Sequence, residues 1–103
     1  MDFQFGAVNF NFPRSIFTER NSCGQQLDHV MSEVDEVKEA FLDESRLFEQ
    51  CVMEIADLTH SLETYWRMLA DQRGDDYVER IFDQVIKKNR DRGYYDLEED
   101  EAV

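Results

Sequence analysis

The fold is decided by residues 25–69, QQLDHVMSEVDEVKEAFLDESRLFEQCVMEIADLTHSLETYWRML. This stretch contains two pairs of acidic residues: Glu33 and Glu36 in SEVDE, and Glu54 and Asp57 in MEIAD. Each pair has i,i+3 spacing, which places both carboxylates on the same side of a helix. The spacing therefore predicts two helices, each with a local pair of carboxylates.

Each half of the stretch also carries an apolar stripe with helical spacing. The first stripe is Leu27, Val30, Met31, Val34, Val37 and Phe41, and the second is Phe48, Cys51, Ile55, Leu58, Leu62, Tyr65, Trp66 and Leu69. The stripe changes phase at Asp43-Glu44-Ser45, as it would where one helix ends and a second begins. We therefore expect an antiparallel helix hairpin that turns near Ser45.

The hairpin would bring the two acidic pairs together. Glu33 would lie level with Asp57 and Glu36 level with Glu54, and both pairs lie on the same rotational side of their stripes. Four carboxylates at one place repel one another and raise each other's pKa. A hard divalent cation relieves that repulsion, and an all-oxygen ligand set suits Mg²⁺ or Mn²⁺.

Capping signals give the helix limits. Ser22 and Gln25 have the spacing of a capping box, which predicts a helix from Cys23 to about Leu42. Ser45 is the expected N-cap of a second helix, which runs to about Asp71 before Gly74.

A third helix is expected with Asp76 as its N-cap and an end near Asn89 or Arg90. The predicted fold is an all-α helical bundle, built on the hairpin plus this third helix and completed by a partner subunit. Residues 22–93 form the helical domain.

The two ends of the chain differ from this domain. Residues 1–21 contain five phenylalanines and are expected to form an extended aromatic arm that packs on the bundle, or that stacks on a substrate ring. Residues 94–103 are expected to be a flexible acidic tail.

Composition limits the possible functions. The 103 residues carry a net charge of −13, which argues against binding a nucleic-acid polymer. No apolar run is long enough to predict a transmembrane helix, and the first residues do not resemble a signal peptide. Cys23 and Cys51 form no metal or redox spacing, so a reduced cytoplasmic setting is expected.

A basic cluster follows the third predicted helix. Lys87, Lys88, Arg90 and Arg92 lie in KKNRDRGYY, inside a strongly acidic chain. They could simply suit the negative end of the helix dipole. Alternatively, they could bind phosphates, because lysine supplies a point charge and arginine a planar fork.

The sequence over residues 25–95 resembles the MazG-like nucleotide pyrophosphohydrolases of the all-α NTP pyrophosphatase superfamily. The resemblance rests on QLDHVMSEVDEVKE at 26–39, on EIAD, and on KKNRDRGYY. It implies metal-dependent hydrolysis of a nucleoside triphosphate to a monophosphate and pyrophosphate, by a homodimer or homotetramer. Ser32 stands where the family often has a further acid, which leaves the number of metal ions open.

The resemblance also implies roles for individual residues. Mg²⁺, or Mn²⁺, would be held by Glu33, Glu36, Glu54 and Asp57. Glu36 is our candidate for the catalytic base. The substrate would be bound by Lys87, Lys88, Asn89, Arg92 and Gln26.

Three alternatives remain open at this point. The chain could be a non-enzymatic helical dimerisation or interaction module whose acids are merely solvated. It could be a degenerate member of the family that binds nucleotides without cleaving them. A di-iron bundle is disfavoured, because only Asp57 and His60 approach the required Glu-x-x-His spacing.

Overall fold

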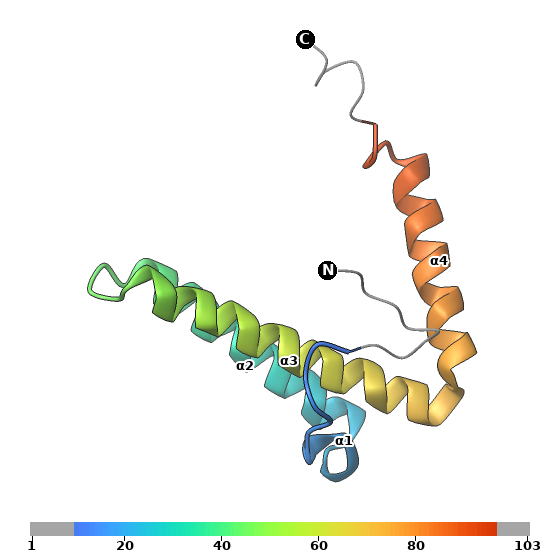
Figure 1. The fold of residues 1–103 in the computed structure, drawn as a ribbon, viewed down its shortest axis with the longest axis horizontal. Helices are drawn as coiled ribbons and strands as arrows, with labels where there is room; N and C mark the ends of the chain where they lie inside the picture. The colour runs from blue at the N-terminus through green and yellow to red at the C-terminus, as the bar shows by residue number, and fades with distance from the viewer. Residues whose placement is uncertain (1–9, 97–103) are drawn as a thin grey trace.

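The computed structural model describes residues 10–96, and within this range every regular element is an α-helix. The helices are α1 (Phe17–Arg20), α2 (Cys23–Leu42), α3 (Phe48–Arg73) and α4 (Asp75–Asp91) (Figure 1). The all-α prediction is confirmed for these residues. None of these helices is long and apolar enough to cross a bilayer.

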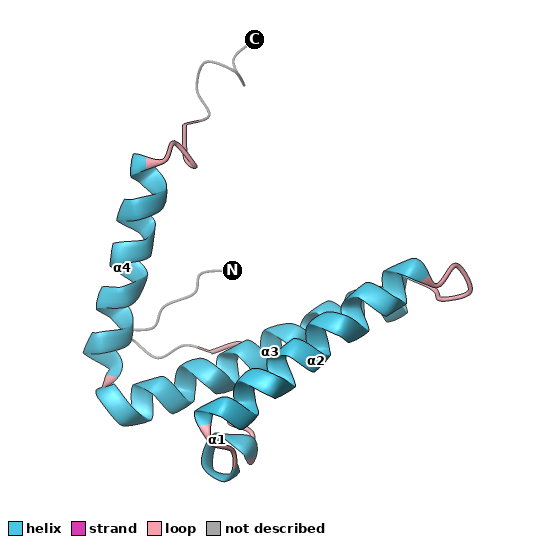
Figure 2. Cartoon of the chain, turned by 180° about the vertical axis from the view of Figure 1, so that it is seen from behind, coloured by secondary structure: helices cyan, strands magenta, loops and turns pink. Residues whose placement is uncertain are grey.

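The helices α2 and α3 run antiparallel and side by side as the predicted hairpin (Figures 1 and 2). Its tip is the end that contains the turn 43–47, and its base is the end where α2 begins and α3 ends. The predicted capping box starts α2: Gln25 N–H donates to Ser22 Oγ over 3.1 Å, and Ser22 N–H donates to Gln25 Oε1 over 2.8 Å. The limits predicted for this helix, Cys23 and Leu42, are confirmed.

The prediction that Ser45 caps α3 is wrong. Asp43 Oδ1 accepts hydrogen bonds from both the backbone N–H and the hydroxyl of Ser45, so the serine is engaged within the turn. The N-cap is Leu47, whose N–H donates to Gln50 Oε1 over 2.9 Å. As a result, α3 begins two residues later than a Ser45 cap would imply.

A single glycine joins α3 to α4. Gly74 has φ 91° and ψ 157°, a conformation that residues with a Cβ rarely adopt. It is also the N-cap of α4, so the prediction of an Asp76 cap is two residues late. Beyond this joint α4 leaves the hairpin at a wide angle (Figure 1). Its first turns are held by the buried side chain of Val78 and by the Phe82 ring, which lies 4.6 Å from the Trp66 ring.

Residues 10–21 of the aromatic arm pack on the base of the hairpin. Residues 10–16 are irregular, but Phe17–Arg20 form the short helix α1, so the prediction of an extended arm to residue 21 is wrong at these four residues. Thr18 of α1 is buried, because α1 contacts α3. Residues 1–9 of the arm and 97–103 of the predicted acidic tail lie outside the described residues.

Few apolar side chains are buried among the residues that the structure describes. They are Val30, Ala40, Cys51, Met68 and Val78, and the burial of Cys51 confirms its predicted place on the α3 stripe. Many other members of the stripes are exposed: Leu27, Met31, Val34, Phe41, Phe48, Ile55 and Leu62. Among residues 10–96, the hairpin therefore keeps a large apolar surface exposed.

Candidate metal centre

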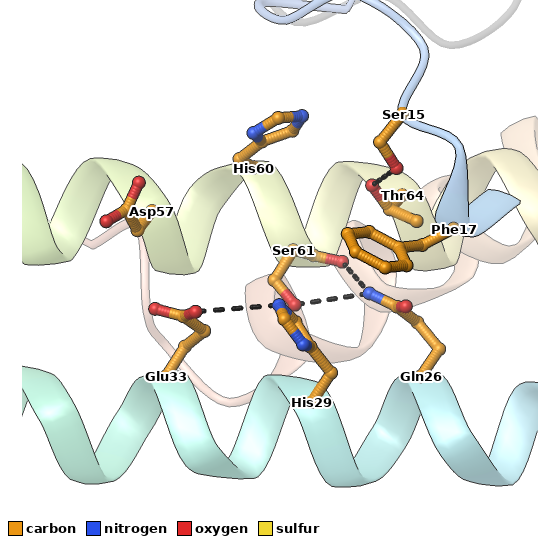
Figure 3. Close-up of a pocket in the computed structure, with 9 residues that line it drawn as sticks. All are labelled: Ser15, Phe17, Gln26, His29, Glu33, Asp57, His60, Ser61 and Thr64. Carbon is orange, nitrogen blue, oxygen red and sulfur yellow. Dashed lines mark hydrogen bonds and ion pairs between the residues drawn. The ribbon is translucent and has the colours of Figure 1, made fainter. Parts of the chain in front are cut away.

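Three carboxylates from the two acidic pairs meet midway along the hairpin. Glu33 and Glu36 of α2 and Glu54 of α3 each offer an oxygen atom, and these atoms lie within 4.8 Å of one another. Asp57 lies outside this group of three. It lines the same cavity as Glu33, whose side chain extends from α2 toward α3 (Figure 3). The turn at 43–47 sets this register, because it pairs residues that are about equally distant from the tip.

Glu33 occupies the most protected position of the four acids. Its side chain is 14% exposed, and its Oε2 is buried with no hydrogen-bond donor among the described residues. Burial raises the pKa of Glu33 to about 7, helped by a hydrogen bond with Glu36 and by the charges of Glu36, Asp57 and Glu54. The site therefore disfavours a full set of negative charges unless a cation is present.

The donors present fit a hard divalent cation. Three carboxylate oxygens lie close enough together to be ligands of one ion, and the buried Oε2 of Glu33 has no hydrogen-bond partner among residues 10–96. Mg²⁺ and Mn²⁺ prefer such oxygen ligands. The Nε2 atom of His29 lies 3.5 Å from Glu33 Oε1, where a histidine can orient a carboxylate ligand.

A cavity of about 210 Å³ adjoins the acidic cluster on the side toward the base of the hairpin. It shares Glu33 and Asp57 with the acids, and its remaining walls are Ser15, Phe17, Gln26, His29, His60, Ser61 and Thr64 (Figure 3). The Phe17 ring lies 5.7 Å from the His29 ring, and His60 Nε2 is buried without a partner among residues 10–96. The cavity thus combines aromatic surface with unused hydrogen-bonding capacity.

Gln26, a predicted substrate ligand, is 1% exposed and already fully used within the fold. Its Nε2 donates to Ser61 O over 3.0 Å and to Ser61 Oγ over 3.2 Å, while its Oε1 accepts from Asn21 over 2.8 Å. It lines the cavity, but its polar atoms tie α2 to α3 and to the segment before α2. Its role in the structure is to hold the cavity wall.

The arm forms another wall, which is held by a buried carboxylate. Glu63 is 2% exposed, and it accepts the backbone N–H groups of Asn11 over 3.0 Å and Phe12 over 2.9 Å. Arg67 donates to Phe12 O over 2.6 Å, and the Phe12 ring stacks on His60 at 4.6 Å. This clamp fixes the arm beside the cavity and holds one face of the His60 ring.

The basic residues predicted to bind substrate lie elsewhere in the single chain. Lys87, Lys88, Asn89 and Arg92 are at the far end of α4, which points away from the hairpin (Figure 1). Lys87 is paired with Asp91 at 3.3 Å. The structure therefore does not bring these residues to the acidic cluster within one chain.

Sequence reasoning missed most of the cavity wall and the clamp. The signal was present in α3, where His60, Glu63, Thr64 and Arg67 follow the 3-1-3 spacing that apolar core residues normally occupy. Polar residues with this spacing, next to an apolar stripe, indicate a helix face that is covered by a segment with hydrogen-bonding groups. Here that cover is the backbone of the arm.

Comparisons of the chain with protein-family models, with curated protein sequences and with solved structures found no match. The case for a function therefore rests on the contacts of the described residues.

Proposed function

We propose that this protein is a Mg²⁺-dependent nucleoside triphosphate pyrophosphohydrolase, with Mn²⁺ as a possible substitute. The observation that carries the proposal is the meeting of Glu33, Glu36 and Glu54 within 4.8 Å beside a cavity that Glu33 also lines, together with the rings of Phe17 and His29. An interaction module would have no use for this coincidence, because solvated acids repel and gain nothing from proximity.

The four acids have distinct parts in this reaction. Glu33, Glu36, Glu54 and Asp57 would hold the metal ion, which when bound neutralises phosphate charge and activates water. Glu36 is exposed, in contrast to Glu33, so one of its oxygens is open to the attacking water and can take its proton. Glu33, oriented by His29, keeps the cluster in register with the cavity.

The cavity suits the nucleoside part of the substrate. Phe17 and His29 offer aromatic surface on which a base can stack. Ser15, Thr64 and His60 Nε2 supply hydrogen-bonding atoms at the same place. Ser15 and Thr64 already share a hydrogen bond of 3.0 Å between their hydroxyls, which holds the arm close to α3 at this wall.

The active form would be a homodimer or homotetramer. This part of the proposal is supported by the apolar stripe residues that the single chain leaves exposed, since a second copy would bury them in a larger bundle. Sedimentation velocity at several protein concentrations would test it. A monomer at all concentrations would contradict it.

The test of function is pyrophosphate release from a panel of ribo- and deoxyribonucleoside triphosphates, with Mg²⁺, with Mn²⁺ and with chelator. We expect metal-dependent release in the wild type. Glu54→Gln should lower it by more than about 100-fold, which is the loss that even outer partners of a metal can produce. Glu49→Gln is the matched control, because it removes the same charge from an exposed position in the first turn of α3.

Two outcomes would contradict this proposal. If the folded wild type releases no pyrophosphate from any nucleotide, the enzyme function is wrong and nucleotide binding without cleavage becomes the alternative to measure. If Glu54→Gln and Glu49→Gln behave alike, the acids are a solvated surface and the interaction module is favoured.

A further inference from the structure

An open recess of about 540 Å³ lies toward the tip of the hairpin, and it adjoins the acidic cluster on the side away from the cavity. Its lining residues are Ser45, Arg46, Gln50, Met53 and Glu54. Glu54 belongs to both the recess and the cluster, as Glu33 belongs to both the cavity and the cluster. Cavity, carboxylates and recess therefore follow one another along the hairpin.

The spacing of α3 confirms that the three sites share one side of the helix. Gln50, Glu54, Asp57, Ser61 and Thr64 are separated by four, three, four and three residues. At about 1.5 Å per residue, Gln50 lies roughly 6 Å beyond Glu54, and Ser61 lies roughly 6 Å beyond Asp57 on the other side. An elongated ligand bound at the carboxylates would reach the cavity with one end and the recess with the other.

Among the residues that line the cavity and the recess, Arg46 is the one lysine or arginine. Its Nε lies 3.7 Å from Asp43 Oδ2, and its terminal nitrogens have no hydrogen bond or ion pair within residues 10–96. Hydrogen bonds from Ser45 lower the pKa of Asp43, which therefore stays ionised and holds the guanidinium from the side. A fork of N–H donors is left available at the edge of a cluster of acids.

Gln50 adds a second donor to the recess. Its Oε1 accepts the N–H of Leu47, so the amide is fixed in orientation and its Nε2 has no partner among the described residues. Arginine and a primary amide are suitable donors for phosphate oxygens. The recess thus contains a guanidinium and an amide donor, whereas the cavity contains aromatic rings and no lysine or arginine.

We propose that Arg46, together with Gln50, binds the two phosphates that leave as pyrophosphate, with the nucleoside in the cavity. This inference rests on the proposed function, and it assigns a direction to the substrate along the hairpin. It also names a phosphate-binding arginine that lines the same recess as Glu54, whereas the basic cluster of α4 lies away from the carboxylates in the single chain.

The role of Arg46 follows from the charge balance of the reaction. The water oxygen forms a bond to the α-phosphorus, and the bond from that phosphorus to the α–β bridging oxygen breaks. The electron pair stays with the bridging oxygen of the departing pyrophosphate, and the proton of the water passes to Glu36. Negative charge therefore grows on the pyrophosphate side, where Arg46 lies.

The experiment measures the affinity for pyrophosphate, and separately for a nucleoside monophosphate, by calorimetry in the presence of Mg²⁺. Arg46→Ala should weaken pyrophosphate binding by about 10- to 100-fold, since charged hydrogen bonds contribute about 1.5–3 kcal/mol. Monophosphate binding should change by less than about twofold. Arg46→Lys should recover part of the loss, because lysine keeps the charge without the fork.

Arg80→Ala is the matched control, because it removes an arginine from the surface of α4 beside Tyr77 and far from the recess. The paired variant Lys87→Ala/Lys88→Ala measures the rival assignment to the basic cluster. Circular dichroism checks the fold, which should persist because Arg46 lies in the exposed turn at the tip.

The outcomes separate this inference from the proposed function. Wild-type-like pyrophosphate affinity in Arg46→Ala, with a large loss in the α4 variant, overturns the assignment of Arg46 while hydrolysis stands. A wild type that binds pyrophosphate through Arg46 but hydrolyses no nucleotide retains the phosphate site and removes the catalysis. A wild type that does not bind pyrophosphate at all overturns the inference.

Discussion

The base and the tip of the hairpin are held together by different kinds of contact. At the base, a network of buried polar groups joins three segments: Gln26 links α2 to Ser61, and Glu63 links α3 to the arm. At the tip, the Cys51 thiol donates to Ala40 O over 3.3 Å, and around it the side chains of Leu42, Leu47 and Phe48 are 68–76% exposed.

The difference shows which end of the hairpin is fixed by contacts within the chain. Buried hydrogen bonds need defined geometry and penalise any displacement, so the base has one well-defined arrangement. Exposed apolar side chains require no defined geometry, and they stabilise the protein only when another surface covers them. The acidic cluster lies at the boundary, with Glu33 on the ordered side and Glu54 on the side toward the tip.

The largest effect on stability should come from removing the clamp at the base. Glu63→Ala leaves two backbone N–H groups of the arm without an acceptor, and it should lower the free energy of unfolding by about 3–4 kcal/mol. Urea denaturation measures this value, and protease cleavage near residue 12 should become faster. Glu49→Ala, an exposed acid of the same helix, is the control and should lie within about 0.5 kcal/mol of the wild type. Equal stability of the two variants would contradict the clamp.

Next in size is the link between the two helices. Gln26→Leu should cost about 2–3 kcal/mol, because the carbonyl and hydroxyl of Ser61 and the Asn21 amide lose their partner. Ser61→Ala should cost less, about 1 kcal/mol, because the bond to the Ser61 carbonyl remains. A double-mutant cycle by chemical denaturation checks this prediction. Additive effects would show that Gln26 and Ser61 do not act together.

The pH dependence of stability tests the acidic cluster between the base and the tip, through the protonation of Glu33. Its pKa of about 7 lies above the ordinary value of 4.5, so the folded state binds the proton more tightly than the unfolded state does. The free energy of unfolding should therefore fall as the pH rises between these two values. One pKa unit corresponds to about 1.4 kcal/mol, and because neighbouring acids share part of the shift, we expect a total loss of about 2 kcal/mol.

The measurement compares metal-free wild type with Glu33→Gln by denaturation between pH 4 and 8. The difference between the two should change over this window and stay constant above it. Saturating Mg²⁺ should reduce the pH dependence in the wild type, because a bound cation favours the ionised acid. A difference that stays flat with pH would show that Glu33 titrates as an ordinary surface acid.

The smallest effect is expected at the tip. Phe48 is 76% exposed, so Phe48→Ala should change the stability of the dilute protein by less than about 0.5 kcal/mol. The same variant should weaken self-association, measured by sedimentation, if a second copy covers this surface. A loss of more than 1 kcal/mol in dilute monomer would show that the tip is packed within one chain, and the contrast with the base would disappear.

Local signals in the sequence predicted the hairpin well. The capping box at Ser22 and the phase change of the apolar stripe depend on residues a few positions apart, and the structure has α2 at its predicted limits. The start of α3 was mispredicted because Asp43 competes for Ser45, which propensity alone does not reveal. The helix α1 was missed because four residues carry too little periodic pattern.

The candidate site was only partly predictable. Equal spacing from the turn was enough to bring Glu33 and Glu36 toward Glu54. The arm could not be placed, because its contacts with Glu63 are made by backbone N–H groups that every sequence has. Arg46 had no distinguishing neighbour in the sequence, and its place in the same recess as Glu54 follows from the detailed path of the turn.

The backbone dihedral angles of Gly74 set the direction of α4, so a small change in them moves the far end of the helix a long way. The helix has 17 residues and is therefore about 25 Å long, so a change of about 10° at its base would displace its far end by about 4 Å. The position of the basic residues at that end therefore depends strongly on the φ and ψ of Gly74. A residue with a Cβ at position 74 would strain this conformation. It would thereby re-aim the lysines and arginines of α4 without altering any of them.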